Sequence, residues 1–103
     1  MDLKKYLNNT YYNLSINQYD FDYLNSLNED NFLRIYMLFK KYGFYFINDI
    51  IIKYLEIFEM DENYVESEIL KLKNKLGHNF IYIIGNDMTY LNEIIDNQEF
   101  EDD

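Results

Sequence analysis

Cysteine, proline and alanine are missing from this chain of 103 residues, and Arg34 is its only arginine. Without cysteine there is no disulfide, no thiolate nucleophile and no cysteine-based zinc or iron–sulfur site, which fits a reducing cytoplasm. No apolar run approaches the roughly 18 residues that a membrane-spanning helix needs, and the N-terminus lacks the apolar stretch of a signal peptide. We therefore expect a protein that stays in the cytoplasm of a bacterial host cell and makes no membrane contact.

Asparagine, isoleucine, lysine, tyrosine and phenylalanine are abundant instead. These are the amino acids of AT-rich codons. Their abundance predicts a low-GC bacterial genome, or a phage or other mobile element that lives on one.

Hydrophobic residues make up 49% of the chain and aromatic residues 19%. This apolar content is enough to fold one domain with one modest core. The net charge is −10, because 19 acidic residues stand against nine lysines and arginines. Beyond Lys75 the chain contains carboxylates but no lysine or arginine. Such a charge repels nucleic acid and anionic membranes and attracts basic proteins.

Two segments carry the sequence pattern of an amphipathic helix with both ends marked. Asn28 and Gly43 bracket the first, which predicts a helix over about 29–42. Asp61 and Gly77 bracket the second and predict a helix over about 62–76. A short apolar segment at helical spacing follows each one and predicts a short buried helix. The apolar positions are Ile47, Ile50, Ile51, Tyr54 and Leu55 in the first segment and Phe80, Ile83 and Ile84 in the second.

The two ends of the chain are less regular. Within residues 1–28 the apolar residues begin at helical spacing and then alternate as in a strand. The helical positions are Leu3, Tyr6 and Leu7, and the alternating ones are Tyr12, Leu14 and Ile16. We predict a short N-terminal helix, an irregular or extended stretch, and a short helix over about 20–27. Residues 97–103 are acidic and predict a disordered tail.

The two helical regions resemble each other. Positions of the first long helix recur 34 residues later, and positions of the following short segment recur 33 residues later. The matched sets are Ile35, Leu38, Tyr42 and Gly43 with Ile69, Leu72, Leu76 and Gly77, and Ile50, Ile51, Leu55 and Phe58 with Ile83, Ile84, Met88 and Leu91. Such recurrence predicts units that bury their apolar faces against each other. The predicted fold is all-α, with two stacked helix-turn-short-helix repeat units (29–60 and 61–95) in a domain of residues 29–96, on which residues 1–28 pack.

Residues 38–44, 49–51 and 55–58 together look like the repeat of mitochondrial transcription termination factors. The second unit is similar at Leu72 to Gly77, Ile83, Ile84 and Leu91. The resemblance covers about residues 32–95 and implies an arc of stacked helical hairpins. It does not extend to the duplex-DNA binding of that family, which needs a basic concave face that this chain lacks.

No catalytic or metal site stands out in the sequence. His78 is the only histidine, and directly after Gly77 it is better explained as a turn residue than as a catalytic or metal-binding one. Glu62 and Glu66 lie one helical turn apart, but such pairs usually form a solvated face rather than a cation site. We therefore expect no enzyme activity, no metal and no cofactor.

Carboxylates on the predicted helices are the candidate contact residues. At fixed positions they can imitate the phosphates of a nucleic acid and occupy a basic groove on a partner, which a flexible tail does poorly. The predicted partner-binding residues are Asp61, Glu62, Glu66, Glu68, Asp87 and Glu93. In the plainer interpretation, the acidic residues serve only to keep a small protein soluble.

The leading hypothesis is a non-enzymatic protein-binding inhibitor that blocks a basic nucleic-acid-binding protein. The general profile is similar to that of small acidic anti-CRISPR proteins, which implies a phage or mobile-element product with a CRISPR effector as its partner. One alternative is a helical-repeat nucleic-acid-binding module whose cations share a face: Arg34, Lys40, Lys41, Lys53, Lys71, Lys73 and Lys75. Another is an oligomeric scaffold, because a two-unit repeat leaves apolar ends that a second copy would cover in a homodimer.

Overall fold

The computed structural model describes the backbone of residues 1–101 and the side chains of residues 1–98. Every regular element in that part of the chain is helical, which confirms the predicted all-α class. In chain order, with η for a 3-10 helix, the elements are η1 (Leu3–Lys5), α1 (Asn9–Gln18), α2 (Phe21–Ser26), α3 (Glu29–Lys41), α4 (Ile47–Lys53), η2 (Leu55–Glu59), α5 (Glu62–Leu76), α6 (Phe80–Asn86), η3 (Met88–Leu91) and α7 (Asn92–Glu101).

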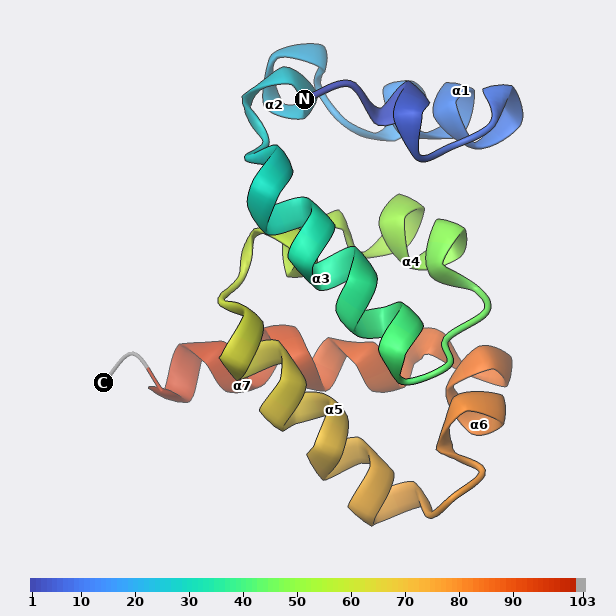
Figure 1. The fold of residues 1–103 in the computed structure, drawn as a ribbon, viewed down its shortest axis with the longest axis vertical. Coiled ribbons are helices and arrows are strands. Elements are labelled where there is room, and N and C mark those ends of the chain that lie inside the picture. Colours follow the sequence, from blue (N-terminus) through green and yellow to red (C-terminus); the bar gives the residue numbers. More distant parts are fainter. Residues whose placement is uncertain (102–103) are drawn as a thin grey trace.

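The helices form a slab whose longest dimension is 36 Å and whose shortest is 21 Å. Figure 1 shows α1 and α2 across one end, α3 and α5 running in the same direction on the near side, and α7 crossing behind α5. α3 packs on η2 and α5, α5 packs on α6 and α7, and α1 packs on α4. The first 28 residues therefore lie against the elements that follow them.

The two long helices begin and end close to the positions that the sequence predicts. The Asn28 side chain accepts the backbone N–H of Asn31 at 3.0 Å, and the Asp61 carboxylate accepts that of Tyr64 at 3.1 Å. Each bond satisfies one of the amide groups that a helix leaves unpaired at its first turn. The predictions of helices over 29–42 and 62–76 are thus confirmed within one residue.

Aromatic rings from α3 and η2 build the centre of the core. Phe58 stacks on Phe32 with ring centroids 4.8 Å apart, and on Phe39 at 5.6 Å. Leu3 and Leu24 from the N-terminal helices belong to the same buried cluster. Each buried side chain of this size contributes roughly 1.5–3 kcal/mol relative to an exposed one. The core therefore joins the N-terminal segment to both later parts of the chain.

Gly43 and Gly77 stand at the C-terminal ends of the long helices α3 and α5, with φ angles of 88° and 86°, values that favour glycine. After each glycine come a seven-residue helix and a 3-10 helix: α4 and η2 in the first case, α6 and η3 in the second. The predicted glycine stops and short helices are therefore confirmed. That the two parts superpose as one stacked repeat stays a prediction.

The N-terminal segment differs from its prediction. The stretch expected to be irregular or extended is helix α1, which the Asn8 side chain caps by accepting the N–H of Tyr11 at 3.0 Å. Leu14 and Ile16 are exposed, so their alternation does not mark a buried strand face. The helix is instead anchored by Tyr19 at its end, whose hydroxyl donates to the carbonyl of Ile52 in α4 at 2.9 Å.

The acidic C-terminal tail also needs a correction. α7 continues to Glu101, so residues 97–101 are helical rather than disordered. The rest of the predicted tail, residues 102–103, lies outside the described residues. α7 packs on both α5 and η3, whereas the sequence prediction considered the charge of this segment alone.

Replacing Gly77 by alanine should destabilise the fold. Its φ of 86° and ψ of −169° belong to a region that is essentially restricted to glycine, and an added methyl group would meet no atom within 4 Å. The cost is therefore backbone strain alone, about 1–3 kcal/mol. Urea unfolding followed by circular dichroism measures it. Asn74→Ala, an exposed change in the last turn of the same helix, is the control and should be neutral or stabilising. If Gly77→Ala and the natural chain unfolded at the same urea concentration, position 77 would carry no backbone strain.

Candidate protein-interaction surfaces

The six carboxylates predicted to bind a partner do not form one surface. Glu62 and Glu66 line the same groove between α3 and α5. Asp61 caps α5, and Asp87 caps η3 by accepting the backbone N–H of Thr89 at 3.2 Å. Glu93 pairs with Lys75, which joins α7 to the end of α5. The structure therefore brings together only the carboxylates in the first turns of α5.

Glu68 is an interior residue of this fold. Its side chain is 2% exposed and pairs with Lys71 at 3.1 Å, while the hydroxyl of Tyr64 donates to it at 3.3 Å. The sequence placed Glu68 among the contact carboxylates, but α7 packs on α5 beside it, and Tyr64 bonds both Glu68 and the carbonyl of Ile94 in α7. A buried, paired carboxylate is held by its own chain, which argues against Glu68 as a contact residue.

Glu66 is held by two donors from the end of α3. The Tyr42 hydroxyl donates to its carboxylate at 2.7 Å and the Lys41 ammonium at 3.0 Å. These two bonds, that of Tyr42 first, lower the pKa of Glu66 from its ordinary value of 4.5. The carboxylate therefore stays ionised and fixes the spacing of the two helices.

The same arrangement occurs near the N-terminus. Tyr6 donates to Glu29 at 2.9 Å and Lys5 pairs with it at 3.3 Å, and these bonds lower the pKa of Glu29. In both places a Lys-Tyr dipeptide at the end of one element holds a glutamate of a later helix. Tyrosine hydroxyls thus supply hydrogen-bond donors to carboxylates for which the chain has too few cations.

A third tyrosine–glutamate bond joins α2 to η2. The Tyr23 hydroxyl donates to Glu59 at 2.6 Å. Burial of the phenol and its bond to Glu59 raise the pKa of Tyr23 well above its ordinary value of 10.0. Glu56 lies close enough to raise it further, so η2 presents two carboxylates beside α2. Neither carboxylate is paired with a cation in the part of the chain that the structure describes.

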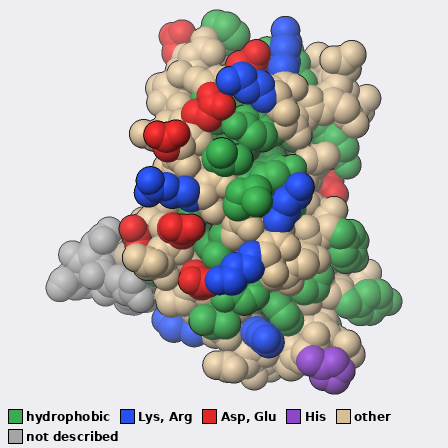
Figure 2. All heavy atoms as spheres, in the orientation of Figure 1, with side chains coloured by type: hydrophobic (Ala, Val, Ile, Leu, Met, Phe, Trp, Pro, Cys, Tyr) green, Lys and Arg blue, Asp and Glu red, His purple; other side chains and the backbone are tan. Residues whose placement is uncertain are grey.

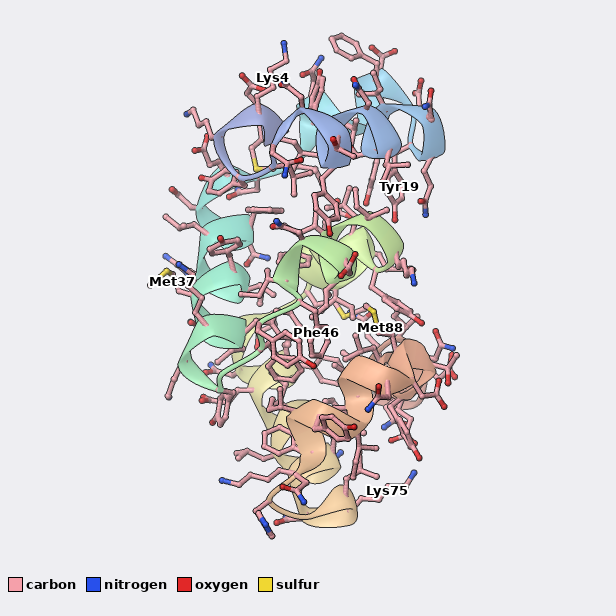
Figure 3. All side chains as sticks on the ribbon, turned by 90° about the vertical axis from the view of Figure 1, so that its right-hand side faces the viewer. Lys4, Tyr19, Met37, Phe46, Lys75 and Met88 are labelled. Carbon is pink, nitrogen blue, oxygen red and sulfur yellow. The ribbon has the colours of Figure 1, made fainter. Side chains whose placement is uncertain are left out.

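The groove between α3 and α5 has a volume of about 580 Å³. Its lining combines apolar and charged side chains: Asp30, Leu33, Arg34, Met37, Leu38, Lys41, Glu62 and Glu66. Figure 2 shows hydrophobic side chains running down the middle of this face, with acidic ones gathered mainly on the left and basic ones on both sides. Figure 3 shows Met37 pointing from α3 away from the body of the protein.

Sequence reasoning missed the α3 wall of this groove. Leu33 and Met37 are 42% and 54% exposed, although apolar residues on a helix are usually assigned to the core. A signal was present, because both residues lie outside the buried stripe of Phe32, Ile35 and Phe39, on the otherwise polar side of α3. Arg34 lies between them and forms no ion pair among the described residues.

No group of three or more potential ligands, whether histidine, aspartate or glutamate, is arranged to hold a metal ion within the described part of the chain. Among the same residues, no helix combines the length and the apolar character that crossing a membrane requires. Comparisons with protein-family models, with curated proteins and with solved structures found no match to this chain.

The Glu66 contacts predict a pH-dependent contribution to stability. Because the folded-state pKa of Glu66 is lowered, this contribution is present above the ordinary value of 4.5 and is lost as the pH falls through the folded-state value. Glu66→Gln should therefore unfold at lower urea than the natural chain at pH 7. The difference between the two midpoints should shrink as the pH falls below 4.5.

Glu62→Gln, one helical turn earlier on α5, is the matched control because Glu62 forms no hydrogen bond or ion pair among the described residues. It should stay close to the natural chain over the same pH series. If the midpoint difference for Glu66→Gln did not change with pH, the bonds from Tyr42 and Lys41 would not stabilise the ionised carboxylate.

Proposed function

We propose that this protein is a non-enzymatic inhibitor that binds a basic nucleic-acid-binding protein and competes with the nucleic acid for it. In its most specific form, the proposal is a phage or mobile-element anti-CRISPR protein whose target is a CRISPR effector. The observation that carries the proposal is an excess of surface carboxylates that the chain does not neutralise itself.

Ion pairs account for few of the carboxylates. Within residues 1–98 they neutralise Glu29, Glu66, Glu68 and Glu93. Many exposed carboxylates of the same region have no cationic partner: Asp20, Asp22, Asp30, Glu56, Glu59, Asp61 and Asp96. Unpaired surface carboxylates speed encounters with a positively charged partner and disfavour negatively charged ones.

Several of these carboxylates are held in place before any partner arrives. Asp61 is fixed by its capping bond to Tyr64, and Glu59 by its bond from Tyr23. Groups that are already ordered lose less conformational entropy on binding than flexible side chains do. This supports carboxylates on helix ends, rather than a mobile acidic segment, as the mimic of nucleic-acid phosphates.

The cations of the alternative nucleic-acid-binding module are partly neutralised. Lys41, Lys71 and Lys75 are each paired with a glutamate. Lys40 lies over the ring of Tyr36 at 5.4 Å. The remaining cations are too few to offset a net charge of −10, so binding of a phosphate backbone is disfavoured.

Capture followed by competition tests the proposal. Tagged protein is incubated with lysate of a low-GC bacterium that carries its defence systems, and bound proteins are eluted in steps of increasing salt. The purified partner is then loaded with fluorescent nucleic acid, and the acidic protein is titrated in. We expect micromolar concentrations to release the nucleic acid. Continued binding of nucleic acid at saturating acidic protein would overturn the proposal.

A pair of variants tests the contribution of α5. Asp61→Asn with Glu62→Gln removes two charges, while asparagine still caps the helix. Asp20→Asn with Asp22→Asn removes two charges at α2 and serves as the control. We expect the α5 variant to need at least a fivefold higher concentration for release, corresponding to about 1 kcal/mol. If both variants raised the concentration needed for release equally, the partner would be attracted by the overall negative charge and would make no specific contact at α5.

A further inference from the structure

The outer side of α3 carries a pattern that is complementary to itself. Its first turn carries Glu29 and Asp30, and its last turn carries Lys40 and Lys41. Exposed apolar side chains lie between the two charged ends. The order along α3 is acidic, then apolar, then basic. A second α3 placed antiparallel to the first therefore sets its basic end against the acidic end of the first, and apolar side chains against apolar ones.

We propose that two copies of the chain pair through α3 and the groove beside it, with their α3 helices antiparallel across a two-fold axis. In such an isologous interface each contact occurs twice, so a surface must match its own rotated copy. The inference does not rest on the proposed function, because it is argued from the mixed charges and the exposed apolar side chains of this face. It shares Asp30 and Glu62 with the carboxylates of the proposed function and leaves those of α2 and η2 outside the contact.

The helix geometry sets the register of the pair. Asp30 and Lys41 are eleven residues apart, about 16 Å along a helix. An axis near the middle of α3 therefore places Asp30 opposite Lys41 of the second copy at both ends. The Lys41 ammonium is exposed and has three donors, so it can bind Asp30 while it keeps its bond to Glu66. The same register places Leu33 against the second copy's Met37 and Leu38, so that the exposed apolar side chains cover one another.

The groove also offers a partner for Arg34, which forms no ion pair among the described residues. Arg34 and Glu62 line the same groove, and neither forms an ion pair among the described residues. In the antiparallel pair, Arg34 of one copy lies over the groove of the other, where Glu62 is available. Because the two-fold axis repeats each contact, Arg34 of each copy pairs with Glu62 of the other.

A second copy fits this face better than a basic partner does. A purely basic segment would meet Arg34 and Lys41 in the groove and be repelled by them. Two chains of charge −10 repel each other elsewhere on their surfaces, but this repulsion is screened over about 8 Å at physiological salt. Association is therefore favoured on a face where charges of both signs accompany exposed apolar side chains.

Sedimentation equilibrium of the purified protein at physiological salt tests the pairing. We expect the mass of two chains at high micromolar concentration and dissociation on dilution. Leu33→Ser with Met37→Ser should weaken association at least tenfold. Leu14→Ser with Ile16→Ser is the matched control, because these α1 residues are 49% and 41% exposed but lie outside the α3 face. Circular dichroism verifies that both variants fold.

Charge and cross-linking variants test whether the two copies pair through α3. Asp30→Lys should dissociate the pair, whereas Asp20→Lys, with the same change of charge on α2, should not. Because the chain has no natural cysteine, Met37→Cys should form disulfide-linked dimers under mild oxidation and Leu14→Cys should stay monomeric. A natural chain that remains monomeric at several hundred micromolar, or variants of α1 and α3 that behave alike, would overturn the proposal.

Discussion

The constraint on which this structure depends is the shortage of cations, nine lysines and arginines against 19 acidic residues. Folding brings helices together, and their carboxylates need donors that ammonium groups alone cannot supply. Tyrosine hydroxyls fill this role at Glu29, Glu59 and Glu66, in each case joining elements more than twenty residues apart. A neutral phenol donates a hydrogen bond to a carboxylate without adding charge. The helices are therefore held together while the surface stays acidic.

These contacts determine which surfaces the molecule presents. Lys41 and Tyr42 bind Glu66 and hold the end of α3 beside α5, which creates the groove along their length. The groove mixes charges of both signs with exposed apolar side chains. The N-terminal end of α5 presents Asp61 and Glu62, two carboxylates without a cationic partner among the described residues, and there we propose that a basic protein binds. The outer side of α3 is the face that we propose a second copy covers.

The sequence predicted the elements that depend on local signals. Asn28, Asp61, Gly43 and Gly77 mark helix ends because caps and left-handed glycines act within a few residues, and the structure confirms all four. α1 was missed because its residues show no clear apolar face, and Tyr19 anchors it through a contact with Ile52, 33 residues away. Glu68 was misplaced for the same reason, since its burial depends on where α7 packs. The groove likewise needs two helices, and no pattern within one helix reveals it.

The central claim is that the unpaired carboxylates act on a partner outside the molecule. The most direct test is the dissociation constant for the captured partner over a salt series from about 50 to 500 mM, where the screening length falls from roughly 14 to 4 Å. If fixed carboxylates mimic phosphates, the dissociation constant should rise steeply with salt, and Asp61→Asn with Glu62→Gln should flatten the slope. A dissociation constant that does not change with salt would contradict the account, because binding would then rest on apolar contact alone.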